Sequence, residues 1–212
     1  LQLAKACADG KTRLIYSSSA AVYGEPKWDL DKPIEETSTL APVNPYGLSK
    51  MTCENWFKTY QHLYGLDYVA LRYFNVFGPR QLGGSPYAGV VANWIHAIHY
   101  NKPLVIYGDG HQTRDFIYVT DVVEANIAAL DCYDGGFKTF NICSGIKTSL
   151  NDIVEYLKSE IDKPFNVIYE EPRKEVRDSV GSNTRSLIGL EWKPLHTFRE
   201  GLEKTLEWRG VL

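Results

Sequence analysis

The alternation of strand and helix signals in the first 80 residues most restricts how this chain can fold. A short run at 13–19 ends in three serines, and a second, largely apolar run occupies 67–77. Between these runs, Pro45 suits the first turn of a helix and Gly65 suits its end. Strand, helix and strand in this order predict a right-handed parallel βαβ unit, and therefore an α/β protein.

The alternation continues after a Gly- and Pro-rich loop at 78–86, which we interpret as a boundary between two lobes. Further helices are expected at 87–100 and at 197–208. Another should begin near Thr120 and Asp121, whose side chains can cap it, and one more should run from a cap at Thr148 or Ser149 to about Glu160. Further strands are expected at 104–107, 117–119, 139–143 and 165–169. Residues 1–8 are typical of the end of a helix, with Gly10 as its stop.

Composition narrows the range of partners. The chain of 212 residues is 44% apolar and 23% charged, which fits a soluble globular protein of one or two lobes. Its 23 basic and 26 acidic residues provide no broad positive surface for nucleic acid or an anionic membrane, so an anionic partner should be small. The chain has no transmembrane or secretory-signal pattern, and we expect it to be cytoplasmic. Its cysteines and histidines lack metal-ligand spacing, so we assign no metal.

Tyr46 and Lys50 are the side chains with the clearest chemical potential. They are four positions apart in the expected helix, so they share a face and can approach one group together. The pKa of a phenol, about 10, has to fall by about three for it to act as a base near pH 7, and neighbouring positive charges have that effect. Lys50 is one such charge, and an oxidised nicotinamide ring is another. The spacing alone also fits two solvated side chains on a helix.

Five sequence blocks, in order, extend the pattern over nearly the whole chain. They are SSSAAVYG at 17–24, NPYGLSK at 44–50, LRYFNVFGPR at 71–80, GDGHQTRDFIYVTDV at 108–122 and EVRDS at 175–179. Together they resemble the nucleotide-sugar epimerase/dehydratase family of the extended short-chain dehydrogenase/reductases. The resemblance implies NAD as cofactor and a UDP-sugar as substrate.

The resemblance also implies a domain organisation. The chain corresponds to the C-terminal part of a Rossmann-like doubly wound parallel sheet plus a small mixed α/β lobe. Residues 1–79, joined by about 120–145, are expected to belong to the NAD-binding domain. Residues 80–119 and 146–212 are expected to form the UDP-sugar-binding lobe.

By the same resemblance, Tyr46 is the acid/base, Lys50 lowers its pKa and holds the nicotinamide ribose, and Ser19 hydrogen-bonds the reacting sugar oxygen. Further cofactor contacts are expected at Ser17, Ser18 and Tyr73. The implied reaction removes the C4 hydroxyl proton through Tyr46 while hydride leaves C4 for NAD. The 4-keto sugar then rotates and takes hydride back on its other face, which produces the C4 epimer.

The two residues after Ser19 favour epimerisation over the family's other reactions. Dehydratases of the family carry an acidic pair at the positions of Ala20 and Ala21, and its decarboxylases commonly carry an acidic residue matching Ala21. Alanine cannot transfer a proton. We therefore expect a UDP-hexose 4-epimerase. The alternatives are a UDP-glucuronate 4-epimerase or decarboxylase of the same fold, and a non-catalytic fragment or RNA-binding scaffold.

For the nucleotide, the resemblance implies diphosphate contacts at Asn75 and Arg114, with the backbone around Val90 and the ring of Tyr107 against uracil. Arginine suits phosphate because it is permanently charged and can bind two oxygens. A surface ion pair with Asp115 is the alternative for Arg114. The alternative for Tyr107 is an aromatic side chain of a strand that packs in the core.

Two further substrate contacts lie near the end of the chain. The family's usual Arg-x-Gly-Asp/Glu element is replaced by PRKE at 172–175, so Arg173 is displaced by one position from the expected UDP ligand. Ser179 matches a position at which a bulky residue closes the pocket around C2 in some 4-epimerases. The small side chain predicts space for an N-acetyl group, and hence acceptance of UDP-GlcNAc and UDP-GalNAc beside UDP-glucose and UDP-galactose.

One expected element does not occur in these 212 residues. The family's Gly-x-x-Gly-x-x-Gly turn, which brings a helix N-terminus to the pyrophosphate, and the acidic residue that reads the adenosine ribose correspond to positions before Leu1. We therefore expect the 212-residue chain alone to hold NAD weakly and to be inactive. The resemblance also implies a homodimer formed through the helix that carries Tyr46.

Overall fold

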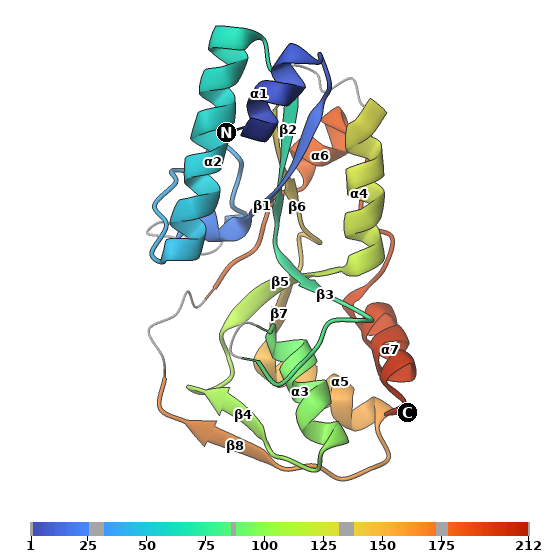
Figure 1. Ribbon diagram of the computed structural model, residues 1–212. Helices are drawn as coiled ribbons and strands as arrows, with labels where there is room; N and C mark the ends of the chain where they lie inside the picture. Colours follow the sequence, from blue (N-terminus) through green and yellow to red (C-terminus); the bar gives the residue numbers. More distant parts are fainter. Residues whose placement is uncertain (1, 26–31, 86–87, 132–137, 173–177, 212) are drawn as a thin grey trace.

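The computed structural model describes residues 2–25, 32–85, 88–131, 138–172 and 178–211, in two groups of helices and strands (Figure 1). The first group surrounds a three-stranded parallel sheet, ordered β1 (Leu14–Ser19), β2 (Tyr68–Tyr73) and β6 (Thr139–Ile142). Helices α1 (Gln2–Asp9) and α2 (Pro45–Tyr64) cover one face of this sheet, and α4 (Val119–Asp131) and α6 (Thr184–Gly189) cover the other (Figure 1). Helices on both faces of a parallel sheet are the doubly wound arrangement expected from the sequence.

The boundaries of α2 follow from local chemistry. The Asn44 side chain accepts a hydrogen bond from the Gly47 amide at 2.8 Å, Pro45 occupies the first turn, and Gly65 ends the helix with φ 68°. A positive φ is strained for any residue with a Cβ atom, which is why glycine suits this position. The prediction that Pro45 opens and Gly65 closes this helix is confirmed.

The apolar run at 67–77 forms two strands, whereas the sequence predicted one. β2 pairs with β1 and β6, and the chain then leaves this sheet at Phe74, whose amide donates to the Ile142 carbonyl at 3.0 Å. The next segment, β3 (Asn75–Phe77), pairs with β5 (Thr113–Tyr118) in another sheet. Apolar residues continue from β2 into β3, so the hydrophobic pattern does not reveal the change of partner strand.

The second group contains strands of both orientations. In the sheet β3-β5-β7, β7 (Lys147–Ser149) is antiparallel to β5, while β4 (Leu104–Tyr107) and β8 (Val167–Glu170) form a parallel pair. Helices α3 (Val90–His99), α5 (Leu150–Glu160) and α7 (Phe198–Arg209) pack around a core that includes Trp94, Ile98, Phe116, Leu157 and Leu206. Strands of both orientations with helices packed around them make this group a mixed α/β arrangement.

One predicted helix cap is confirmed and another is wrong, while the cap at Thr197 was not predicted. Ser149 begins α5 in a capping box with Asp152, and Thr197 begins α7 in the same way with Glu200. By contrast, α4 already begins at Val119, so Asp121 lies inside its first turn. The Asp121 carboxylate instead accepts the His196 amide at 3.1 Å and lies 2.8 Å from His196 Nδ1. A contact 75 residues away in sequence thus replaces the expected local cap.

Several short elements differ from the sequence-based expectation. The expected helix 87–100 is observed as α3, with position 87 outside the described residues, and the expected strand 165–169 begins later, as β8. Helix α6, strand β7 and the 3-10 helix η1 (Ala20–Tyr23) were not expected. They span three to six residues, and α6 has no side-chain cap, so their local signals are weak.

Two negative findings apply to the described ranges. No helix there combines the length and the hydrophobicity that crossing a membrane requires. Nor do three or more His, Cys, Asp or Glu side chains in those ranges cluster in a way that could hold a metal ion.

Candidate active site

The end of β1 and the first half of α2 are in direct contact. Ser19, the last residue of β1, caps η1 by accepting the Ala21 amide at 3.2 Å. A Cβ atom added to Gly47 would lie 2.4 Å from the Ala21 carbonyl oxygen, so only glycine allows α2 to approach η1 this closely. One turn further along α2, Lys50 Nζ donates to the Ser17 carbonyl at 2.7 Å. The structure therefore brings Ser19 and the helix that carries Tyr46 and Lys50 to one edge of the sheet.

Lys50 is also close to two aromatic rings. Its Nζ atom lies 5.6 Å from the ring centre of Tyr46 and 5.2 Å from that of Tyr16. At these distances a cation interacts favourably with the face of an aromatic ring. The i, i+4 spacing read from the sequence thus places a positive charge beside the Tyr46 ring, and the Tyr46 side chain itself is 55% exposed.

The three expected cofactor contacts on β1 and β2 separate into two groups. Ser17 is exposed, and its hydroxyl oxygen lies 3.1 Å from the Tyr73 hydroxyl, which donates to Asn126 Oδ1 at 2.9 Å. Ser18 is 2% exposed, and its hydroxyl donates to Glu54 Oε1 at 2.5 Å. Because side chains alternate along a strand, Ser17 is accessible while the Ser18 hydroxyl is directed to the buried side.

Four expected substrate contacts line one cavity of about 680 Å³ in the second group of elements. Asn75 comes from β3, Val90 from α3, Tyr107 from β4 and Arg114 from β5. The volume is within the range of small-molecule sites in proteins. The side-chain amide of Asn75 donates to the Asp115 carbonyl at 2.8 Å, and the Arg114 guanidinium donates to the Thr113 carbonyl at 2.9 Å. Residues more than 30 positions apart in sequence therefore share one space.

Polar side chains that the sequence did not single out also line this cavity. They are Gln81, Ser85, Asn93 and Gln112. Gln112 donates to the Tyr107 carbonyl at 2.7 Å, which connects the end of β4 to the segment before β5. Gln112 is two positions before Arg114. Residues two apart in extended chain point to the same side, so this spacing could have indicated that Gln112 lies beside Arg114 in the cavity.

Asp115 is buried and does not form the surface ion pair considered as an alternative for Arg114. Its carboxylate is 0% exposed and accepts hydrogen bonds from the Ser144 amide and hydroxyl and from the Gly145 and Gly181 amides, at 2.7–3.1 Å. Burial raises the pKa of Asp115 to about 6, although these hydrogen bonds act to lower it. Asp115 therefore fastens two loops to β5, while its neighbour Arg114 faces the cavity.

Ser179 lies beside the start of β5 and outside the lining of the cavity. Its amide donates to the Thr113 carbonyl at 3.3 Å, and the preceding Asp178 carboxylate accepts the Thr113 amide and hydroxyl at 2.9 and 2.8 Å. Ser179 itself is half-buried. Arg173 is outside the described residues.

A parallel strand that ends in hydroxyl groups, followed by a helix with a Tyr-x-x-x-Lys pair, is typical of α/β proteins of the Rossmann-like short-chain dehydrogenase/reductase class. The chain belongs to the NAD dependent epimerase/dehydratase family, which matches residues 1–143. The expected family is thereby confirmed. The family is NAD-dependent, so the expected cofactor is confirmed as well.

Individual relatives support the same assignment. The UDP-glucose 4-epimerase of Mycolicibacterium smegmatis is 34% identical over 203 residues, which cover 94% of this chain and 63% of the relative. The UDP-N-acetylglucosamine 4-epimerase of Methanobrevibacter ruminantium, solved with UDP-N-acetylmuramic acid, is 37% identical with a TM-score of 0.89, over 98% of this chain and 66% of that one. The UDP-glucose 4-epimerase of Thermus thermophilus, solved with NAD, is 31% identical with a TM-score of 0.87, over 99% of this chain and 68% of that one.

These similarities confirm the Rossmann-like α/β fold and leave the reaction open. The chain spans a little over three fifths of the length of the Mycolicibacterium relative. Relatives at about the same identity carry other names, including a UDP-glucuronate 4-epimerase of Thermodesulfobacterium geofontis and the human dTDP-D-glucose 4,6-dehydratase, both 32% identical. The choice among reactions therefore depends on the residues of the site.

Proposed function

We propose that this chain carries the reactive side chains and the nucleotide cavity of an NAD-dependent UDP-sugar 4-epimerase. The observation that carries the proposal is the hydrogen bond from Lys50 to the Ser17 carbonyl, because it holds the Tyr-x-x-x-Lys helix against the strand that ends in Ser19. We further propose that residues 1–79 with about 120–145 belong to the NAD-binding domain. Residues 80–119 and 146–212 then form the UDP-sugar-binding lobe, apart from α6, which packs against β6 of the first sheet.

The carboxyl edge of β1 and β2 has groups suited to NAD. In doubly wound sheets, ligands bind beyond the carboxyl ends of the strands, and this edge presents the exposed hydroxyl of Ser17, the Tyr73 hydroxyl and the ammonium group of Lys50. When bound, NAD supplies the hydride acceptor and donor that C4 inversion requires. Ser18 is the exception, because its hydroxyl is already bonded to Glu54.

In this proposal the protein's own residues move and hold protons and charge. Tyr46 accepts the proton of the C4 hydroxyl and returns one to the C4 oxygen after the sugar has rotated. Lys50 places a positive charge beside the Tyr46 ring, and Ser19 donates a hydrogen bond to the C4 oxygen to orient it.

The cavity of about 680 Å³ suits the UDP part of the substrate. We assign the diphosphate to Arg114 and Asn75, since a guanidinium can bind two phosphate oxygens at once. Uracil is assigned to the space between the Tyr107 ring and the backbone at Val90. Arg173 remains a proposed further UDP ligand.

The two alanines after Ser19 favour epimerisation over dehydration. Ala20 and Ala21 form the first half of η1, so no carboxylate is present at either position to remove a second proton or protonate a leaving hydroxyl. Epimerisation and decarboxylation of UDP-glucuronate are the alternative reactions. They differ from the proposal in their products.

The experiment is to incubate the natural full-length protein, with NAD, separately with UDP-galactose, UDP-GalNAc and UDP-glucuronate, and to separate the products. We expect the C4 epimer of one or both hexoses without an added reductant. Accumulation of a 4-keto-6-deoxy sugar, or release of CO₂ from UDP-glucuronate, would contradict the proposal. The 212-residue chain by itself is expected to be inactive.

Replacing Ser179 by Tyr tests the proposed acceptance of acetylated sugars. A bulky ring beside C2 leaves no space for an N-acetyl group, so turnover of UDP-GalNAc should fall at least about tenfold while turnover of UDP-galactose stays within about threefold. Kinetics with both substrates provide the measurement. Ser159→Tyr, at an exposed position of α5, is the matched control. Full activity of Ser179→Tyr on acetylated sugars would overturn this assignment.

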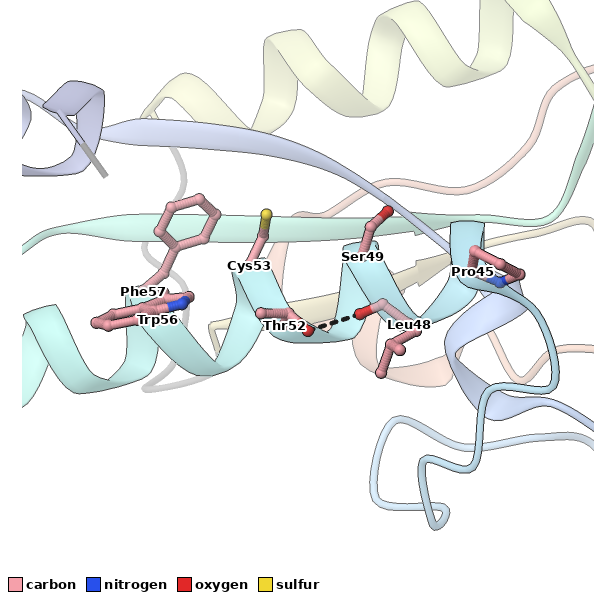
Figure 2. Close-up of a pocket in the computed structure, with 7 residues that line it drawn as sticks. All are labelled: Pro45, Leu48, Ser49, Thr52, Cys53, Trp56 and Phe57. Atoms are coloured by element: carbon pink, nitrogen blue, oxygen red, sulfur yellow. Dashed lines mark hydrogen bonds between the residues drawn. The ribbon is translucent and has the colours of Figure 1, made fainter.

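We also propose that α2 forms a homodimer interface. A hollow of about 520 Å³ lies along this helix. Figure 2 shows the side chains that line it, which are Pro45, Leu48, Ser49, Thr52, Cys53, Trp56 and Phe57. Leu48 and Trp56 are 51% and 45% exposed, and the Thr52 hydroxyl is bonded back to the Leu48 carbonyl at 2.8 Å, so the hollow is mainly apolar. Apolar surface of this kind commonly marks a contact between proteins.

Trp56→Glu should convert the dimer into a monomer because it places a charge in the lining of the apolar hollow. Sedimentation of the natural full-length protein at several concentrations provides the measurement. Lys58→Glu, an exposed change of charge on the same helix, is the control and should leave the dimer intact. A monomeric wild type, or a dimeric Trp56→Glu variant, would exclude this interface.

A further inference from the structure

A buried polar network lies directly behind the candidate active site. Its centre is a bidentate ion pair in which Arg72 Nε and Nη2 contact Glu54 Oε1 and Oε2 at 3.0 and 2.6 Å. Both residues are nearly inaccessible, at 4% and 7% exposed. Burial of an ion pair has a large desolvation cost, so such a pair is weak evidence for a role in stability alone.

The first arm of the network connects α2 with β1. Tyr46, Lys50 and Glu54 occupy three successive turns of one face of α2. Lys50 donates to the Ser17 carbonyl at 2.7 Å, and Glu54 accepts the Ser18 hydroxyl at 2.5 Å. Two adjacent turns of the helix are thus bonded to two adjacent residues of the strand. These bonds set the register between Tyr46 on the helix and Ser19 at the end of the strand.

The second arm reaches the other flank of Ser19. Arg72 Nη1 donates to the Tyr23 hydroxyl at 2.8 Å, and Tyr23 donates to Asn141 Oδ1 at 2.6 Å. Tyr23 is the last residue of η1, the 3-10 helix that Ser19 caps. The residue before Ser19 and the end of the turn after it are therefore both bonded to the same buried ion pair.

We propose that the Glu54–Arg72 pair, acting through Ser18 and Tyr23, is a positioning network that holds Ser19 and Tyr46 in reactive register. The inference rests on the proposed epimerase function. None of the four side chains is expected to touch substrate. Their effect is on the alignment of the C4 oxygen between Ser19 and Tyr46, and misplacement of reacting groups by about 1 Å can lower a rate by about 100-fold.

The test uses two small deletions in the natural full-length protein, Ser18→Ala and Tyr23→Phe, each of which removes one hydroxyl and leaves the ion pair in place. The matched control is Ser186→Ala, which removes another fully buried serine hydroxyl, bonded to the Asn183 carbonyl at 2.8 Å. We measure kcat and KM for UDP-sugar epimerisation together with the unfolding midpoint. A positioning role predicts that kcat falls about tenfold or more in both variants while KM stays within about twofold, with no change of kcat in the control.

The outcomes separate the two proposals. If wild type epimerises UDP-sugars and the folded Ser18→Ala and Tyr23→Phe variants keep wild-type kcat, this inference is overturned and the proposed function stands. A rise in KM without a change in kcat would likewise overturn it. If wild type epimerises no UDP-sugar, the proposed function fails, and this inference fails with it.

Discussion

Tyr46→Phe should lower the kcat for UDP-sugar epimerisation by about 1,000-fold, the middle of the range for loss of a general acid/base. The substitution removes only the hydroxyl that accepts the C4 proton. Tyr46 is 55% exposed and packs little, so α2 and its contact with η1 should be unchanged. The KM for the UDP-sugar should therefore stay near the wild-type value, and steady-state kinetics at saturating substrate provide the measurement.

The matched control is Tyr64→Phe, which removes another exposed phenol from the same helix. It should leave kcat unchanged. A Tyr46→Phe variant that keeps more than about a third of wild-type kcat would remove Tyr46 from the mechanism. The proposal would then need another group to accept the C4 proton.

Arg72→Met should lower the free energy of unfolding by about 3–5 kcal/mol, because it leaves the Glu54 carboxylate buried without its counter-ion. Although burial alone lowers the pKa of Arg72, hydrogen bonds and charge from Glu54 and Tyr23 hold it above its usual value. Arg72 is thus charged at all relevant pH values, and its loss removes a full charge from the pair. Denaturant titration of the variant and wild type measures the change.

Two comparisons make this prediction specific. Arg199→Met removes an arginine whose contact with Glu160 is equally short, at 2.6 Å, but whose side chain is 55% exposed, and it should leave the midpoint unchanged. The double variant Glu54→Leu/Arg72→Met should recover much of the stability lost by Arg72→Met, since no unpaired charge remains. A loss below about 1 kcal/mol in the single variant would contradict the prediction.

Much of the fold was predictable because its signals are local. The bounds of α2 follow from Asn44, Pro45 and Gly65, all within or beside the helix. The caps of α5 and α7 follow from Ser149 and Thr197 in the same way. The break at Phe74 was not predictable, because apolar residues continue from β2 into β3 and the two strands differ in their partner strands.

The candidate site likewise has a part that the sequence indicated and a part that it did not. The i, i+4 spacing of Tyr46 and Lys50 is a property of one helix, and the sequence indicated it directly. Ser18 was grouped with Ser17 because the two are adjacent in sequence. The structure separates them, since the buried partner of Ser18, Glu54, lies 36 positions away.

The sequence by itself determined the order of the longer helices and strands, the family and the chemical types present at the end of β1 and the start of α2, because periodicity, caps and motifs act over a few residues. Only the tertiary structure decided which side chains share a space. The cavity is also lined by Gln81, Asn93 and Gln112, which the sequence did not single out, and the buried network joins Tyr23 to Asn141 across 118 positions. Such contacts depend on how the elements pack in three dimensions, and no local pattern in the chain encodes that packing.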